Sequence, residues 1–237
     1  MSPGSVGVTL YAIFKTAAIT VPTVADALTG RLTLERADRR LADWSRNIVR
    51  RADVDLTVEG LHHVPRDRAC VYMSNHQSNI DIPILYSVFP GTLRMVAKAE
   101  LFKVPLWGRA MREAGFVRVT RSGDRAEAMA AMRECGEAIA RGVNVWIAPE
   151  GTRSVDGRVA KFKKGGFILA RDAKADIVPV AIDGSRDILP KNTRVIRRGA
   201  RVRVSFGAPV SVGERELNAV MAEVRQFIVA HVTEPAG

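Results

Sequence analysis

From Val54 onwards, the chain alternates short apolar runs rich in β-branched residues with amphipathic or Ala-rich stretches of helical length. This alternation predicts an α/β fold with a largely parallel sheet flanked by helices. The expected strands are 54–58, 69–73, 93–97, 116–119, 143–147, 177–182 and 202–206. The expected helices are 83–89, 104–113, 124–141, 165–174 and 214–232. Pro179 predicts that its strand lies near an edge or a bulge, because proline has no N–H for the ladder.

The composition fits a packed globular protein and excludes a disordered chain, with 47% hydrophobic and 26% charged residues among 237. We expect one catalytic domain at 52–237, preceded by a separate N-terminal segment at 1–51. Cys70 and Cys135 are too few for a disulfide framework or a cysteine metal cluster, and they fit a reducing compartment.

The net charge of +11 predicts a polyanionic partner, which is a nucleic acid, an anionic membrane surface or a phosphorylated substrate. A general preference for arginine explains scattered charges equally well, but it does not explain basic residues inside a motif. Aromatic residues make up only 6% of the chain and are not interleaved with a basic stripe. We therefore expect no nucleic acid partner.

The N-terminal segment predicts attachment to a membrane from one side. Residues 6–28 are mostly apolar, but Lys15, Pro22 and Asp26 interrupt them, which disfavours a clean transmembrane span. A signal peptide also fits poorly, because no basic residue precedes this run. The next stretch places an apolar stripe on one face of a helix, formed by Leu34, Ala37, Leu41, Trp44 and Ile48. With arginines on its other faces, such a helix suits the headgroup layer of an anionic membrane, the alternative being an ordinary surface helix packed on the domain.

Segment 75–81, Asn-His-Gln-Ser-Asn-Ile-Asp, directly follows the apolar run 69–73. His76 therefore leaves the end of a strand, and Asp81 lies near the start of the next helix. A turn between them would bring the carboxylate to one ring nitrogen and leave the other free to take a proton. The alternative is a histidine that only caps or packs at a strand end. The residues alone leave both readings open.

Segment 149–154, Pro-Glu-Gly-Thr-Arg-Ser, leaves the strand expected at 143–147. Gly151 allows the backbone to approach a ligand closely. Arg153 offers a planar donor fork suited to phosphate, and the Thr152 hydroxyl adds a donor. Glu150 cannot bind an anion directly, so we expect it to hold an arginine or the loop. In isolation, the same residues also fit a surface turn with a salt bridge.

Arg121 lies just beyond the strand expected at 116–119, where it would share one phosphate with Arg153. Lys161, Lys163 and Lys164 precede a helix that opens with two glycines. They indicate either a further phosphate contact at a helix N-terminus or a solvated basic face.

Several motifs are absent from the sequence. There is no Gly-x-Ser-x-Gly elbow, no Walker loop and no Rossmann glycine fingerprint, which argues against a serine acyl-enzyme and against nucleotide binding. The four histidines are dispersed, so we expect no metal site.

Taken together, these segments resemble the glycerolipid acyltransferase family, over about residues 55–210. The four blocks of that family occur here in order, as Asn75, His76 and Asp81, then Gly115 and Arg121, then Pro149 to Arg153, then Pro179. Residues 98–101 and 162–165 also look like its intervening sequence. Two positions depart from the pattern, Ala148 in place of Phe and Thr120 where Asp is frequent, and both lie beside the implied phosphate site.

The resemblance implies transfer of a fatty acyl group from acyl-CoA or acyl-carrier protein to the free hydroxyl of 1-acyl-glycerol-3-phosphate, giving phosphatidic acid. His76 and Asp81 would be the catalytic pair, and no cofactor or metal would be required. The phosphate of the lysophospholipid would be bound by the residues Arg121, Glu150, Gly151, Thr152 and Arg153. The resemblance implies supporting roles for Asn75, Lys98, Gly115 and Lys163.

The resemblance also implies a monotopic or peripheral enzyme at the cytoplasmic face of the cell membrane. Glycerol-3-phosphate and other lysolipids are alternative acceptors. Outside the enzyme class, the charge allows a basic protein that binds nucleic acid, or a non-catalytic lipid carrier.

Overall fold

The computed structural model describes residues 3–119 and 125–233. The strands are β1 (Asp55–Glu59), β2 (Val71–Ser74), β3 (Leu93–Lys98), β4 (Val117–Val119), β5 (Asn144–Ile147), β6 (Ile177–Asp183) and β7 (Arg201–Phe206). The helices are α1 (Pro3–Leu28), α2 (Leu34–Arg51), α3 (Asp81–Val88), α4 (Ala99–Phe102), α5 (Trp107–Glu113), α6 (Arg125–Ala140), α7 (Gly165–Asp172), α8 (Ser185–Ile188) and α9 (Leu217–Ala230), with a 3-10 turn η1 (Leu61–His63). The expected strands and helices are present, with bounds that differ by at most three residues.

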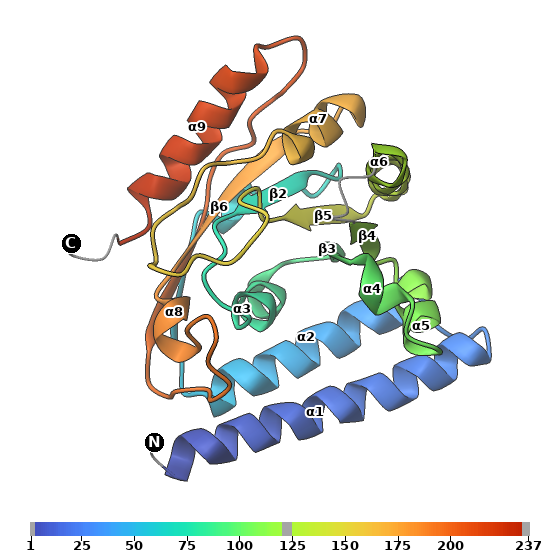
Figure 1. The fold of residues 1–237 in the computed structure, drawn as a ribbon, viewed down its shortest axis with the longest axis vertical. Coiled ribbons are helices and arrows are strands. Elements are labelled where there is room, and N and C mark those ends of the chain that lie inside the picture. Colours follow the sequence, from blue (N-terminus) through green and yellow to red (C-terminus); the bar gives the residue numbers. More distant parts are fainter. Residues whose placement is uncertain (1–2, 120–124, 234–237) are drawn as a thin grey trace.

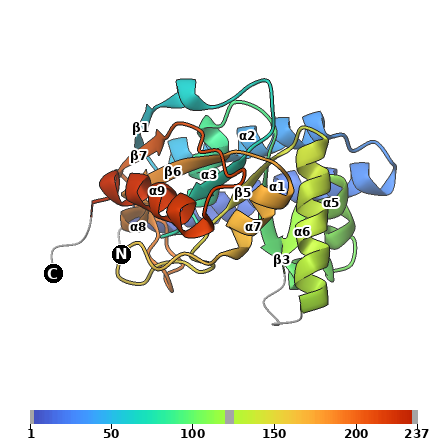
Figure 2. The same ribbon diagram turned by 90° about the horizontal axis from the view of Figure 1, so that it is seen from above.

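Within the described residues, the strands form one seven-stranded sheet in the order β1-β7-β6-β2-β5-β3-β4. Neighbouring strands pair in parallel, except for β6 and β7, which are antiparallel. Helices α2 and α3 cover one face of the sheet, and α6, α7 and α9 cover the other (Figures 1 and 2). The prediction of a largely parallel sheet flanked by helices is confirmed.

Strand β2 lies at the centre of this arrangement, and all four of its residues are buried. Tyr72 points into the core under α2 and α3, whereas Val71 and Met73 point into the core under α7 and α9. A strand covered on both faces reads as a continuous apolar run, which explains the sequence pattern of 69–73. The chain leaves β2 at the carboxyl edge of the sheet, where His76 follows two residues after Ser74.

The structure corrects one alternative for Pro179. Strand β6 lies inside the sheet between β7 and β2, so the edge position is wrong. The pairing with the β7 chain is interrupted at this point: Val180 pairs with Phe206, but the next bridge joins Ile177 to Val210. The β7 side therefore carries one extra residue, which is a bulge. The missing N–H of proline is accommodated there.

Helix α2 packs on the domain with its apolar stripe. Ala37 and Ile48 are buried, and Leu41 and Trp44 pack against the same core. The expectation that this stripe lies in the headgroup layer is therefore wrong, and the ordinary packed helix is the correct description. The prediction of an amphipathic helix is correct, but the apolar face of this helix packs against the core beside the sheet.

Helix α1 continues without a break through Lys15, Pro22 and Asp26 and lies along α2 (Figure 1). Asp26 accepts hydrogen bonds from Arg40 at 2.6 Å and from Arg36 at 3.0 Å, both on α2. Thr16 and Thr23 of α1 also accept hydrogen bonds from α2. The charge of Asp26, which interrupts the apolar sequence, is therefore neutralised inside the hairpin.

The outer side of α1 is apolar. Its largest exposed side chains are Leu10, Ile13, Phe14 and Val21, with 62–69% of their surface accessible. By length and composition alone, α1 is able to cross a membrane, contrary to the expectation from the interrupted sequence. The buried core helix of a soluble protein and an N-terminal signal sequence can have the same length and composition. Val8 and Ala12 of α1 pack in the same core as Ile48 of α2, so the contact between the two helices is partly apolar, and it is the exposed side of α1 that is unusually apolar.

A buried arginine joins α2 to the sheet. Arg94 on β3 is fully buried and forms an ion pair with Asp38 of α2. Its guanidinium also donates to the carbonyl oxygens of Leu93, Ala114 and Leu34. The division at residues 51 and 52 stays a prediction about function, since in packing α2 shares the core of the sheet domain.

Candidate active site

The His76 ring and the Asp81 carboxylate are in direct contact at the carboxyl edge of the sheet. The distance from His76 Nδ1 to Asp81 Oδ2 is 2.7 Å. The same oxygen accepts the backbone N–H groups of Gln77 and Ser78, each at 2.9 Å. Asp81 is the first residue of α3 and is fully buried, so the turn 77–80 wraps around its carboxylate. This is the contact that the spacing of five residues predicts.

These contacts determine which ring nitrogen of His76 is free. An oxygen that already accepts two backbone N–H groups is an acceptor, so His76 Nδ1 carries the proton and donates it. Nε2 then holds the lone pair, and the side chain is 19% exposed. The ring also lies edge-to-face with Trp146, with 6.3 Å between ring centroids. The imidazole therefore has a fixed orientation, and its Nε2 is able to accept a proton.

The backbone of His76 is bound on both sides by the loop that follows β5. Its N–H donates to Glu150 Oε1 at 2.9 Å, and its carbonyl oxygen accepts the N–H of Ser154 at 2.7 Å. The second oxygen of Glu150 accepts the N–H of Ala160 at 2.9 Å. Glu150 is 3% exposed, and burial raises the pKa of its carboxyl group.

This arrangement decides between the uses considered for Glu150. Its two oxygens are occupied by backbone amides, so the structure does not offer it to a phosphate. It holds the loop, as expected, but through Ala160 and His76 rather than through an arginine. His76 and the polar loop 149–154 are therefore joined by direct hydrogen bonds.

The loop 149–154 gathers positive charge around a tight turn. Gly151 has φ +71°, and a Cβ there would meet Lys163 Nζ at 2.9 Å, so the Lys163 side chain lies directly over this glycine. Thr152 is exposed and Arg153 is half-buried. Among the ion pairs of residues 3–119 and 125–233, none involves Arg153 or Lys163. Uncompensated cations beside exposed donors are typical of an anion site.

The remaining candidates fall in three places. Arg121 lies outside the described residues. Lys98 is exposed at the carboxyl end of β3, on the same edge as the other groups. Asn75 is buried and exchanges hydrogen bonds with both backbone groups of Ile182, each at 2.8 Å, so it joins the ends of β2 and β6.

Gly115 lies away from this edge, in the turn before β4. Its φ is +82°, and a Cβ there would lie 2.9 Å from Leu34 and 3.4 Å from Arg94. Its role in the structure is to let the turn pack against α2 and the buried arginine.

Comparison with known proteins agrees with this geometry. A family model described as Acyltransferase matches residues 55–183, which include His76, Asp81 and the loop 149–154. The chain belongs to the acyltransferase family.

Relatives of this acyltransferase share its central part. The chloroplastic 1-acyl-sn-glycerol-3-phosphate acyltransferase BAT2 of Brassica napus is 35% identical over 161 residues, which cover 68% of this chain and 46% of that protein. The human 1-acyl-sn-glycerol-3-phosphate acyltransferase alpha is 36% identical over 155 residues, which cover 64% and 54%. The chain thus spans about half the length of these curated relatives.

A solved structure is similar over nearly the whole acyltransferase. The crystal structure of the 1-acyl-sn-glycerophosphate (LPA) acyltransferase PlsC from Thermotoga maritima superposes with a TM-score of 0.80 and 27% identity. The match covers 95% of this chain and 93% of that one. The similarity therefore includes the fold outside the family model.

Sequence reasoning missed two groups that contact the candidate site. Lys191 lies between α8 and β7 and donates to the carbonyl oxygen of Arg153 at 2.6 Å. Ser78 donates through its hydroxyl to the carbonyl oxygen of Leu189 at 2.6 Å, which holds the same segment against the 75–81 turn. No local pattern marks Lys191. Only its basic character in a loop near the sheet edge would have suggested it.

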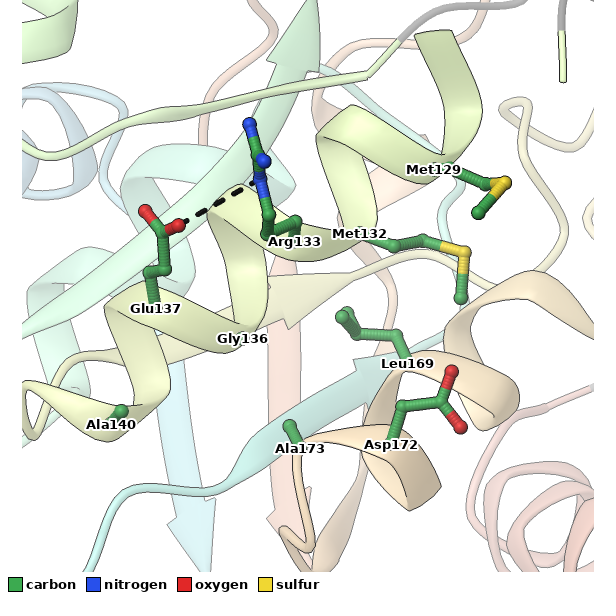
Figure 3. A pocket seen from close by; sticks show the side chains of 9 residues that line it. All are labelled: Met129, Met132, Arg133, Gly136, Glu137, Ala140, Leu169, Asp172 and Ala173. Atoms are coloured by element: carbon green, nitrogen blue, oxygen red, sulfur yellow. Dashed lines mark ion pairs between the residues drawn. The ribbon is translucent and has the colours of Figure 1, made fainter. Parts of the chain in front are cut away.

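The acyltransferase also has a surface groove between α6 and α7, of about 490 Å³ (Figure 3). Met132 and Leu169 give it an apolar lining, and Arg133 forms an ion pair with Glu137 at 3.8 Å on its rim. It contains none of the candidate site residues. The polar groups able to carry out chemistry lie instead at the carboxyl edge of the sheet.

The buried thiols of the acyltransferase are poor nucleophiles. Burial raises the pKa of Cys70 to about 11 and that of Cys135 to about 12. Reactive cysteines need a lowered pKa and access to solvent. In the described part of the chain, no group of three His, Cys, Asp or Glu side chains is arranged to hold a metal ion.

Proposed function

We propose that this chain transfers a fatty acyl group from an acyl thioester to the free hydroxyl of 1-acyl-glycerol-3-phosphate, giving phosphatidic acid. The observation that carries the proposal is the 2.7 Å contact between His76 Nδ1 and Asp81, which leaves Nε2 able to accept a proton in a residue whose main chain is hydrogen-bonded to the cationic loop 149–154. The names of the relatives support this acceptor.

His76 is proposed as the general base. Nε2 takes the proton of the acceptor hydroxyl while its oxygen attacks the thioester carbonyl carbon, and Asp81 stabilises the imidazolium that forms. The tetrahedral oxyanion then collapses, the C–S bond breaks, and the leaving thiolate takes the proton from His76. The ester and a free thiol are the products, and the ring returns to its starting state.

This chemistry requires neither a covalent intermediate nor a resident cofactor. An alkyl thiol has a pKa of about 8.5, so its thiolate leaves far more readily than an alkoxide. Lys98, exposed on the same edge, is proposed to stabilise the oxyanion or to contact a phosphate.

Arg153 and Lys163 are proposed to bind the acceptor phosphate, together with Arg121. The loop that carries Arg153 is hydrogen-bonded to both backbone groups of His76. A phosphate held by this loop therefore has a fixed distance to the base, and fixed geometry is a major source of rate.

The apolar exterior of α1 is proposed to insert into one leaflet of the membrane. Leu10, Ile13 and Phe14 are exposed, whereas the charged Asp26 is paired with arginines of α2. A helix that turns its polar side to a partner and its apolar side outward is suited to a lipid environment. We propose monotopic attachment at the cytoplasmic face, where acyl-CoA and acyl-carrier protein are available.

The direct test is thiol release from acyl-CoA by the purified full-length protein, with lysophosphatidic acid, glycerol-3-phosphate and lysophosphatidylcholine as separate acceptors. We expect thiol release and phosphatidic acid formation with lysophosphatidic acid, lost in His76→Ala while circular dichroism is unchanged. The control His62→Ala alters an exposed histidine of η1 and should retain activity. Faster transfer to another acceptor would refute the proposed substrate, and a His76→Ala rate within about tenfold of wild type would refute the proposed base.

A further inference from the structure

We propose that Lys191 is a further residue of the acceptor site, where its ammonium group, hydrogen-bonded to the Thr152–Arg153 peptide, binds a phosphate monoester. The inference rests on the proposed function for the identity of the acceptor. It extends that site to a segment which lies outside the match to the family model.

The contacts of Lys191 place its charge in the loop 149–154. Its Nζ donates to the carbonyl oxygen of Arg153 at 2.6 Å and lies 3.5 Å from Thr152 Oγ1. An ammonium group has three N–H donors. Two are directed at these neutral oxygens, which leaves the third available to a ligand.

The segment that carries Lys191 is held rigidly at the site. The hydroxyl of Ser78 donates to the carbonyl oxygen of Leu189 at 2.6 Å, and the N–H of Arg197 donates to that of Ile188 at 2.8 Å. Thr193 closes a turn by donating through its backbone and its hydroxyl to Pro190. The ammonium group is therefore fixed relative to the 75–81 turn as well as to the loop.

The local charge favours an anion. Arg153, Lys163 and Lys191 approach the same short loop, and none of them takes part in an ion pair with a described carboxylate. Glu150 is the nearest acidic residue in the loop, and its oxygens are occupied by backbone amides. Like charges brought together repel one another, and a bound dianion removes this repulsion. A phosphate monoester has the charge and the acceptor oxygens that the three cations and the Thr152 hydroxyl require.

The proposed role differs from that of a simple tether. A tether acts only through the neutral Arg153 carbonyl, so its loss lowers stability without changing the response to phosphate. A binding residue acts on the ligand charge, so its loss weakens phosphate binding and arginine restores it. Lys191→Met and Lys191→Arg separate these cases.

The experiment measures the binding of glycerol 3-phosphate to the full-length protein by isothermal titration calorimetry, beside the KM for lysophosphatidic acid. We expect Lys191→Met to weaken glycerol 3-phosphate binding and raise that KM by about tenfold or more, with a smaller change in kcat. Lys191→Arg should recover most of the affinity. The control Lys174→Met, in the turn after α7 at the opposite edge of the sheet, should bind as wild type.

The outcomes separate the two proposals. Unchanged glycerol 3-phosphate affinity in Lys191→Met, or no binding by the wild type, overturns the role of Lys191. Weakened binding in Lys191→Met supports that role even if the wild type transfers no acyl group to lysophosphatidic acid, a result that refutes only the proposed function.

Discussion

The carboxylate of Glu150 accepts a hydrogen bond from the backbone N–H of His76 at 2.9 Å, across 74 residues of chain. The backbone N–H of Ser154, in the same loop as Glu150, donates to the carbonyl oxygen of His76 at 2.7 Å. The residue proposed as the base is therefore fixed at its main chain by the loop proposed to hold the phosphate. Its ring is fixed separately, by Asp81.

Glu150→Gln should lower kcat by about tenfold with little change in the KM of the acceptor, because glutamine has one acceptor oxygen for two backbone N–H groups. The side-chain NH₂ group then faces one of the two backbone N–H donors, and the main chain of His76 is no longer held in place. Steady-state kinetics check this. Glu223 is exposed and forms an ion pair with Arg215, so the control Glu223→Gln should have the kcat of wild type. A Glu150→Gln variant with wild-type kcat would contradict the positioning role.

The same residue predicts a pH dependence of stability. Burial raises the pKa of Glu150 above its ordinary value of 4.5, so folding favours the protonated form. Its stabilising contribution is therefore complete below pH 4.5 and is lost as the pH rises through the raised pKa. Urea unfolding at several pH values should show the free energy of unfolding of wild type falling relative to Glu150→Gln as the pH increases. The opposite slope would contradict the direction of the shift.

Asp81→Asn should reduce kcat/KM by about 10²–10⁴. The single oxygen of asparagine can still accept the N–H groups of His76, Gln77 and Ser78 in the place of Oδ2, but the side chain is neutral. The imidazolium that forms when Nε2 takes a proton then loses the carboxylate charge that stabilises it. Asp187→Asn alters an exposed carboxylate and serves as the control. Activity of Asp81→Asn within about tenfold of wild type would contradict the proposed stabilisation of the imidazolium by the Asp81 charge.

Asp38→Ala should lower the free energy of unfolding by about 3–5 kcal/mol, because it leaves the guanidinium of Arg94 buried without its ionic partner. The matched control on the same helix is Asp43→Ala. Asp43 is 61% exposed and pairs with Arg46 at the surface, so its removal should cost less than about 1 kcal/mol. Denaturant unfolding measures both. Equal effects of the two variants would show that α2 is not anchored through Arg94.

Gly115→Ala should lower the free energy of unfolding by at least about 1–2 kcal/mol, because the residue has φ +82° and an added Cβ would lie 2.9 Å from Leu34. The KM of the acceptor should stay unchanged, since this glycine lies away from the loop 149–154. Gly136→Ala, at a helical position with open space around it, is the control and should not destabilise. A raised KM of Gly115→Ala with normal stability would instead indicate that Gly115 belongs to the binding site.

Whether a contact could be predicted from the sequence depends on how far apart its residues lie along the chain. The His76–Asp81 contact was predictable, because the six residues between the end of β2 and the start of α3 leave few ways to turn. The strands were predictable for a similar reason, since burial on both faces of β2 selects a run such as 69–73. The residue types of the loop 149–154 suggest an anion site, which stays a prediction.

Contacts between distant segments were not predictable. Nothing around Glu150 shows that its oxygens accept N–H groups from His76 and Ala160. Arg94 lies in an apolar strand, but only the fold reveals that Asp38 neutralises it. The same limit explains the error about α2, because an apolar stripe looks alike whether it faces lipid or a sheet. The pairing of Asp26 with arginines of α2 turns a charged residue of α1 toward its partner helix, so the exposed side of α1 is left apolar.

The two hydrogen bonds between the His76 main chain and the loop 149–154 are formed by protein groups alone and need no substrate atom. On the proposed mechanism, the acceptor therefore does not have to bring the base and the phosphate loop together. A thioester bound without its acceptor would then meet an imidazole already able to take a proton, and a water molecule in the place of the missing alcohol would be activated in the same way. The proposed enzyme would limit such hydrolysis by excluding water from the site rather than by keeping its catalytic groups apart.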